Sequence, residues 1–263
     1  MSLHANGFSD DQQRLAGALD QCLAEISSLE ARLAEIARLA PARIAFSTSL
    51  GIEDQAILHA VAVSGAAVDV FTLDTGRLFP ETIDTIALSE QRYGLRLRVL
   101  APEAADVEAL VARDGVLGFR RSIDARKACC EVRKVRPLKR ALAGAGSWIT
   151  GLRRGQSAGR GDVPFAAWDA EHRLVKINPL ANWELERLEA YVAANDIPVN
   201  PLHARGFPSI GCQPCTRAVS PGEDIRAGRW WWESADGKEC GLHANPRRPG
   251  KPVVRSVKEE AAR

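Results

Sequence analysis

Beyond residue 41 the chain alternates between two patterns of hydrophobic and polar positions. Short apolar runs, which are typical of buried strands, take turns with longer segments whose apolar residues recur every three or four positions, as in a helix. Strands are predicted at 43–46, 68–73, 95–101, 147–152 and 173–180, and helices at 53–65, 81–94, 135–144 and 182–196. This alternation predicts an α/β fold with a doubly wound, mainly parallel sheet covered by helices on both faces.

Two segments lie outside this alternation. Residues 10–40 carry leucines and isoleucines at helical spacing, and Pro41 ends that pattern. From about residue 216 the chain is rich in Gly, Pro and Trp and shows no period. We therefore expect an N-terminal helical segment at 1–40, an α/β domain at 41–215 and an irregular C-terminal tail at 216–263.

Composition and charge narrow the class of protein. A 46% hydrophobic content over 263 residues is enough for a sizeable core. The sequence shows neither a leader-like start nor a run of roughly 18 apolar residues, so a soluble cytoplasmic protein is expected. The net charge is only +2, but basic residues cluster at 120–140, 153–160 and 247–255. Such clusters suit a small anion or a nucleic acid, and charge alone does not choose between them.

The loops that follow the predicted strands carry the candidate binding residues. In a parallel sheet these loops meet at one edge, where ligands bind. Small hydroxylated residues follow the first strand and precede a helix, whose free N–H groups favour an anion. Arginines and an acidic turn follow two other strands. The candidates are Ser47, Thr48 and Ser49, then Asp74, Thr75, Gly76 and Arg77, then Arg153 and Arg154.

Four of the six cysteines have the spacing of metal ligands. Cys212 and Cys215 form a CxxC pair, while Cys129 and Cys130 are adjacent. Adjacent cysteines do not bridge each other comfortably, because their Cα atoms lie only about 3.8 Å apart. In a reducing compartment these four cysteines therefore favour a metal site over disulfides. A helix would place Arg133 and Lys134 alongside Cys130, where they would offset thiolate charge.

These motifs together resemble the assimilatory adenylyl-sulfate reductase family, and the likeness extends from about residue 46 to residue 243. The segments that carry it are "FSTSLGIEDQ", "LDTGRLFPET", "WITGLRRGQS", "VKINPLANW", the two cysteine pairs, "EDIRAGRWWWE" and "ECGLH". The resemblance implies a fold of the adenine nucleotide alpha-hydrolase kind. It also implies that Cys129, Cys130, Cys212 and Cys215 hold a [4Fe–4S] cluster.

The resemblance further implies the reaction: adenosine 5'-phosphosulfate (APS) and reduced thioredoxin, or a similar dithiol protein, give sulfite, AMP and oxidised partner. The nucleophile by match is Cys240, which would form a cysteine S-sulfonate. His243 is a candidate to assist that thiol. We expect Arg133, Lys134, Arg153, Arg154, Arg226 and Arg229 to surround the phosphosulfate, the last two through closure of the tail. The cluster would either tune electrostatics at the sulfate or simply pin two segments together.

Two other functions explain part of the same residues. One is the same chemistry on the 3'-phosphorylated nucleotide, PAPS; the four cluster cysteines favour APS. The other is a zinc-binding or nucleic-acid-binding protein, which accounts for neither Cys240 nor the strand-end loops. No CxxC follows Cys240, so the reductant is expected to be a separate protein. We expect neither a nucleic-acid partner nor membrane association, and the sequence is compatible with a homo-oligomer.

Overall fold

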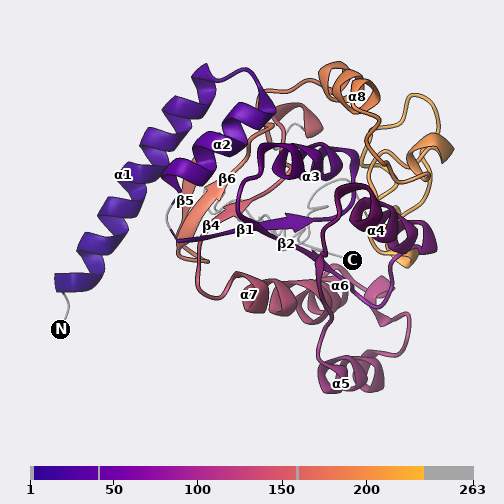
Figure 1. The fold of residues 1–263 in the computed structure, drawn as a ribbon. Coiled ribbons are helices and arrows are strands. Elements are labelled where there is room, and N and C mark those ends of the chain that lie inside the picture. Colours follow the sequence, from indigo (N-terminus) through magenta and orange to yellow (C-terminus); the bar gives the residue numbers. More distant parts are fainter. Residues whose placement is uncertain (1–2, 41, 158–159, 234–263) are drawn as a thin grey trace, which may run out of the picture.

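The computed structural model describes residues 3–40, 42–157 and 160–233. A six-stranded sheet lies at its centre, in the order β3-β2-β1-β4-β6-β5 (Figure 1). Its strands are β1 (Arg43–Thr48), β2 (Val68–Leu73), β3 (Arg98–Leu100), β4 (Ala145–Ile149), β5 (Ala166–Asp169) and β6 (Leu174–Ile177). All neighbouring pairs are parallel except β5 with β6. The predicted doubly wound, mainly parallel sheet is therefore confirmed.

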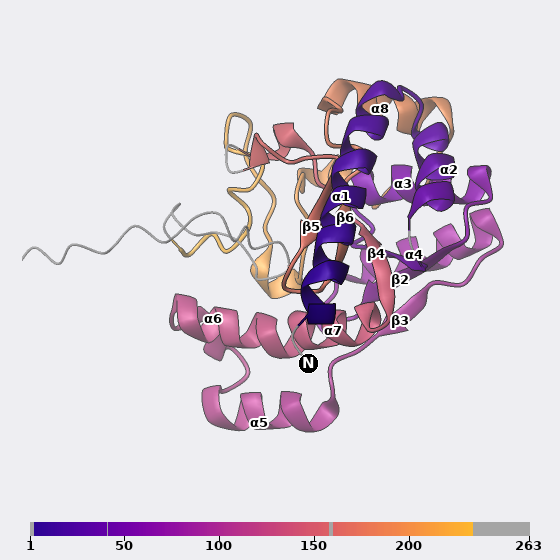
Figure 2. The same ribbon diagram turned by 90° about the vertical axis from the view of Figure 1, so that its left-hand side faces the viewer.

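Helices cover both faces of the sheet. The longer helices are α1 (Leu3–Glu25), α2 (Leu29–Leu39), α3 (Ile52–Ser64), α4 (Pro80–Tyr93), α5 (Ala104–Asp114) and α8 (Leu185–Ala194), and two shorter ones are α6 (Ile123–Cys130) and α7 (Arg136–Leu142). Figure 2 shows α7 on the opposite side of the sheet from α2, α3 and α8. A π-helical turn, Glu131–Val135, joins α6 to α7. Within the described residues, no helix combines the length and the apolar composition that a membrane crossing needs.

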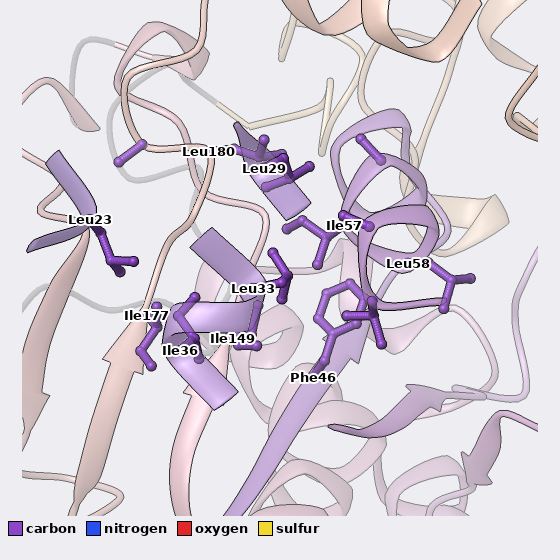
Figure 3. Close-up of a cluster of buried hydrophobic side chains, with 14 of the residues drawn as sticks. Leu23, Leu29, Leu33, Ile36, Phe46, Ile57, Leu58, Ile149, Ile177 and Leu180 are labelled. Atoms are coloured by element: carbon purple, nitrogen blue, oxygen red, sulfur yellow. The ribbon is translucent and has the colours of Figure 1, made fainter. Parts of the chain in front are cut away.

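The N-terminal helical pattern is two helices rather than one. The first helix ends at Glu25. The Ser28 side chain then caps α2 by accepting a hydrogen bond from the Ala31 N–H at 3.2 Å. Both helices pack on the same core: Leu23 from α1 and Leu33 from α2 are completely buried beside Ile149 and Ile177 of the sheet (Figure 3). The two helices of the predicted N-terminal segment, α1 and α2, thus cover one face of the α/β sheet.

The sheet edges differ from prediction at two places. The structure adds β5, which pairs antiparallel with β6 and packs against α1. It also shortens the strand expected at 95–101 to the three residues of β3. Arg98 in that edge strand donates to Asp69 at 2.6 Å. The charged residues of this edge interrupt the apolar run, so the ladder there is short.

Candidate active site

An open pocket of about 240 Å³ lies where β1, β2 and β4 end. This is the edge at which a parallel sheet places ligands. Of the residues predicted for substrate binding, the pocket brings together Ser47, Thr48, Ser49, Thr75, Lys134, Arg226 and Arg229. They come from four separate parts of the chain, and two of these parts, Ser47–Ser49 and Thr75, follow strand ends.

The loop after β1 is held by a buried carboxylate that the sequence analysis missed. Asp54, in the first turn of α3, accepts hydrogen bonds from both the backbone N–H and the hydroxyl of Ser49, each at 2.6 Å. The Thr48 hydroxyl accepts from the Leu50 N–H at 3.0 Å. Burial raises the pKa of Asp54 to about 6, although the bonds from Ser49 oppose that shift. The loop is therefore shaped before any ligand arrives.

Cations line another part of the pocket. Lys134 comes from the π-helical turn, and Arg226 and Arg229 come from the described part of the predicted tail. Arg229 is buried, with its guanidinium 3.2 Å from the Ile210 carbonyl and stacked on the Trp230 ring. A Cβ at Gly211 would lie 2.4 Å from that guanidinium, so glycine is needed for Arg229 to pack there. These cations make the pocket suitable for an anion.

Arg153 stands behind the pocket wall rather than in it. Its guanidinium donates to the Glu53 carboxylate at 2.9 Å and to the Trp183 carbonyl at 3.1 Å, and its side chain is buried. Glu53, which does line the pocket, also accepts from the Gln156 amide at 2.9 Å. Arg153 therefore orients a carboxylate of the pocket. Its neighbour Arg154 donates to the Val163 carbonyl at 2.9 Å and is not part of the lining.

The loop after β2 links the pocket to the cysteines. The Thr75 hydroxyl is 3.2 Å from the Cys212 sulfur, and the Thr75 carbonyl accepts from Arg133 at 2.7 Å. Gly76 has a φ of +67°, which suits glycine, and its N–H donates to Asp74 at 2.8 Å. Arg77 donates to the Val116 carbonyl at 2.7 Å. Asp74, Gly76, Arg77 and Arg133 thus support the loop beside the pocket and do not line it.

The four predicted cluster cysteines come together from two segments. Cys129 and Cys130 end α6, while Cys212 directly precedes a short 3₁₀ turn, Gln213–Cys215, and Cys215 is its last residue. Burial, together with the charge of Cys212, raises the pKa of the Cys215 thiol to about 12. Burial alone would also raise the pKa of Cys212, but Lys134 and the Thr75 hydroxyl lower it overall. These thiols interact electrostatically, and a bound cation would relieve their mutual repulsion as thiolates.

The donor set has the chemistry of an iron–sulfur cluster site. Four cysteine thiolates are the ligands that hold a [4Fe–4S] cluster. An all-sulfur donor set facing Lys134 and Arg133 fits such a group.

The described chain ends on a buried ion pair. Arg126 of α6 donates to Glu233 at 2.7 Å, and the two side chains are only 1% and 6% exposed. The Arg126 guanidinium also lies 4.5 Å from the centroid of the Trp230 ring, and Trp230 is itself buried. Trp231, in contrast, is partly exposed. Residues 230–233 of the predicted tail are therefore fixed to the helix that bears Cys129 and Cys130.

Comparison with known proteins places this fold and site in a family. A family model described as "Phosphoadenosine phosphosulfate reductase domain" matches residues 43–218, which include β1 to β6 and both cysteine pairs. The chain belongs to this family. Within the phosphoadenosine phosphosulfate reductase domain family, several relatives are similar over most of their length.

Among curated relatives, a protein of Agrobacterium fabrum named adenosine 5'-phosphosulfate reductase is 53% identical over 92% of this chain and 91% of its own length. A relative of the same name from Sinorhizobium fredii is 56% identical over 83% of this chain and 87% of its own. Among solved structures, phosphoadenylyl-sulfate (PAPS) reductase from Candida auris, in a phosphate complex, has a TM-score of 0.65 at 25% identity. It covers 78% of this chain and 96% of that one, which confirms the predicted fold.

Two predicted residues of this family member, Cys240 and His243, lie outside the described residues. Sequence reasoning also left out several residues that the pocket contains. Besides Glu53 and Asp54, these include Gln156, Arg160 and His203. Gln156 and Arg160 follow closely on the predicted Arg153 and Arg154, so their place near a strand end was a signal for them. His203 had no such signal.

Proposed function

We propose that this chain reduces APS to sulfite and AMP through an S-sulfonate on Cys240, with thioredoxin or a similar dithiol protein as reductant. The enzyme class follows from the family: the chain is an oxidoreductase acting on a sulfur group, and relatives that are about half identical are named for APS reduction. The observation that carries the proposal is a pocket lined by Lys134, Arg226 and Arg229 that adjoins four clustered thiols.

The residues of the pocket account for substrate binding. The anionic phosphosulfate would lie against the three cations and against the N–H groups at the start of α3. Asp54 would keep the loop of Ser47–Ser49 in place, and Glu53 with its partner Arg153 would form the wall beside it. This arrangement would hold the phosphosulfate sulfur near the cations, where an incoming thiolate would reach it.

The chemistry consists of two substitutions at sulfur. The Cys240 thiolate attacks the sulfuryl sulfur, the bond from that sulfur to the phosphate oxygen breaks, and AMP leaves. A partner thiolate then attacks the Cys240 sulfur, sulfite leaves with the electron pair, and the second partner thiol resolves the mixed disulfide. The partner is thereby oxidised from dithiol to disulfide. The two electrons gained by the sulfuryl group are those lost by the partner.

Cys129, Cys130, Cys212 and Cys215 would hold the [4Fe–4S] cluster. When bound, a cluster supplies localised charge beside the pocket and a covalent link between the two segments. Lys134 connects the pocket with the cysteines, since it lines the pocket and its charge also lowers the pKa of Cys212. Each Cys→Ser change at these four positions should remove iron and activity together. Stoichiometric zinc without labile sulfide in anaerobically purified protein would contradict the cluster.

A sulfite-release assay tests the reaction. Anaerobically purified protein with reduced thioredoxin should release sulfite from APS faster than from PAPS, and should release little with no dithiol present. Without thioredoxin, APS should yield one AMP per active chain and one sulfonate adduct, which intact mass spectrometry with peptide mapping should place on Cys240. Faster turnover of PAPS would instead support the activity for which the Candida auris protein is named.

A pair of cysteine variants separates the nucleophile from other thiols. Cys240→Ser should keep its iron and bind nucleotide but form no adduct, because a serine hydroxyl stays protonated at neutral pH. Cys22→Ser is the matched control, since Cys22 lies on α1 and its sulfur is 3.5 Å from the Glu35 carboxylate. It should retain full activity. Turnover by Cys240→Ser, or an adduct on Cys22, would refute the mechanism.

A further inference from the structure

His203 lines the pocket and has one ring nitrogen without a hydrogen-bond partner among the described residues. The residue lies in a 3₁₀ turn, His203–Arg205, and lines the pocket together with Glu53 and Thr82. Its Nδ1 is 3.0 Å from the Phe207 carbonyl oxygen. Its Nε2 is buried and has no hydrogen-bond partner among the described residues. A buried polar atom without a partner is costly, so its presence on a pocket wall points to a ligand.

The protonation state of the ring follows from its one bond. A carbonyl oxygen only accepts, so Nδ1 of His203 carries the hydrogen and Nε2 has a free lone pair. Burial lowers the pKa of His203, and the nearby Glu53 charge offsets this only in part. The imidazole is therefore neutral at physiological pH. Its Nε2 can accept a hydrogen bond, and it has nothing to offer an oxyanion.

The ring is held in place before any ligand binds. The His203 N–H donates to the Asn200 carbonyl at 3.0 Å, and the Asn200 side chain bonds both the Leu202 N–H and the Thr82 hydroxyl at 3.0 Å. Gly206 ends the turn with a φ of +82°, a conformation that suits glycine. The acceptor is thus rigid, which reduces the entropy lost when a ligand group pairs with it.

A second histidine shows that the orphaned nitrogen alone is not the signal. His172 also has one bonded nitrogen, with Nδ1 3.0 Å from Asp169, and a buried Nε2 without a partner among the described residues. Its ring packs edge-on against Trp148 at 5.3 Å, and it does not line the pocket. The combination of a free acceptor and a pocket position therefore distinguishes His203 from His172.

We propose that Nε2 of His203 accepts a hydrogen bond from the uncharged nucleoside part of the substrate, from either the adenine amino group or a ribose hydroxyl. The inference rests on the proposed function, in which the pocket binds an adenosine nucleotide. Lys134, Arg226 and Arg229 provide for the anionic end of that nucleotide. A neutral acceptor beside Glu53 complements an N–H or O–H donor, so it serves the other end.

Calorimetric binding of AMP to the iron-loaded protein tests this role. His203→Asn keeps an amide donor for the Phe207 carbonyl but has no atom at the Nε2 position, so its Kd for AMP should rise roughly five- to thirty-fold. His203→Gln places an amide oxygen near that position and should recover most of the affinity. His172→Asn is the matched control and should bind AMP as the wild type does. An unchanged Kd for His203→Asn would overturn the proposal.

Nucleotide analogues identify the donor and exclude an indirect effect. Inosine 5'-monophosphate lacks the amino group, and 2'-deoxy-AMP and 3'-deoxy-AMP each lack one hydroxyl. One of the three should bind the wild type at least five-fold more weakly than AMP and should lose no further affinity in His203→Asn. Equal binding of all four nucleotides to the wild type, or an equal loss for all four in the variant, would refute the assignment. Failure of the proposed function is distinct, because the wild type would then bind no AMP.

Discussion

Asp54 makes the stability of this protein depend on pH in a direction that is unusual for a carboxylate. The side chain is buried at the start of α3, and it accepts two bonds from Ser49. Burial nevertheless raises its pKa from 3.8 to about 6. The folded state therefore binds the Asp54 proton more tightly than the unfolded chain does, and ionisation of Asp54 opposes folding.

The size of the effect follows from that difference in pKa. A shift from 3.8 to about 6 corresponds to about 3 kcal/mol of unfolding free energy, at 1.36 kcal/mol per pKa unit. This contribution is fully present below pH 3.8 and is lost as the pH rises through about 6. Asp54→Asn does not titrate and still accepts from the Ser49 N–H. Its stability relative to the wild type should therefore increase from pH 4 to pH 7 by up to about 3 kcal/mol and then level off.

Urea unfolding followed by tryptophan fluorescence at a series of pH values measures this difference. The matched control is Asp69→Asn. Burial alone would raise the pKa of Asp69, but its bonds and ion pairs with Arg98 and Arg43 lower it overall, so its stabilising charge is present throughout the range above pH 3.8. Asp69→Asn should therefore be less stable than the wild type by the same amount from pH 5 to pH 8. A pH-independent difference for Asp54→Asn would show that burial does not raise the pKa of Asp54 as predicted.

Three further changes test other parts of the site. Glu233→Ala removes the carboxylate that pairs with the buried Arg126 guanidinium and should lower the unfolding free energy by about 3–5 kcal/mol in urea titrations. Glu171→Ala, which removes the carboxylate of the exposed pair with Lys139, should cost about 0–1 kcal/mol. Gly151→Ala would place a Cβ 2.3 Å from the Asp54 carboxylate in the pocket, so calorimetry should show loss of AMP binding. In the control Gly161→Ala, the new Cβ meets no atom within 4 Å, and AMP should bind as it does to the wild type. Lys134→Ala should weaken APS binding by about 1–3 kcal/mol, and unchanged affinity would remove it from the anion site.

Hydrophobic period predicted the sheet well where the strands are buried on both faces. It missed β5, because Ala166–Asp169 is a four-residue edge strand whose apolar character comes partly from alanine. It also gave no sign of the break between α1 and α2, since both helices present their leucines to the same core and the stripe continues across Ser28. Hydrophobic periodicity indicates which positions are buried, and the buried positions continue from one helix to the next.

The site was predictable where it depends on strand ends. Ser47–Ser49 and Thr75 reach the pocket because parallel strands end at a common edge. Arg77 and Arg154 start from the same edge, but their long side chains turn to the backbone carbonyls of Val116 and Val163. His203 lies in a return segment without periodicity, so only the tertiary path of that segment places it there. Side-chain direction and irregular chain paths are what the sequence pattern does not encode.

The π-helical turn between α6 and α7 has a consequence for how the chain tolerates length changes. One additional residue in a regular α-helix rotates everything beyond it by about 100°. The wider π turn accommodates such a residue, so Cys129 and Cys130 lie beside the other thiols while Leu138 and Leu142 pack in the core under the sheet. Deleting a single residue from Glu131–Val135 would let this turn return to a regular α-helix, whereas an insertion would rotate α7 away from the core. Insertions there should therefore harm the protein more than single-residue deletions.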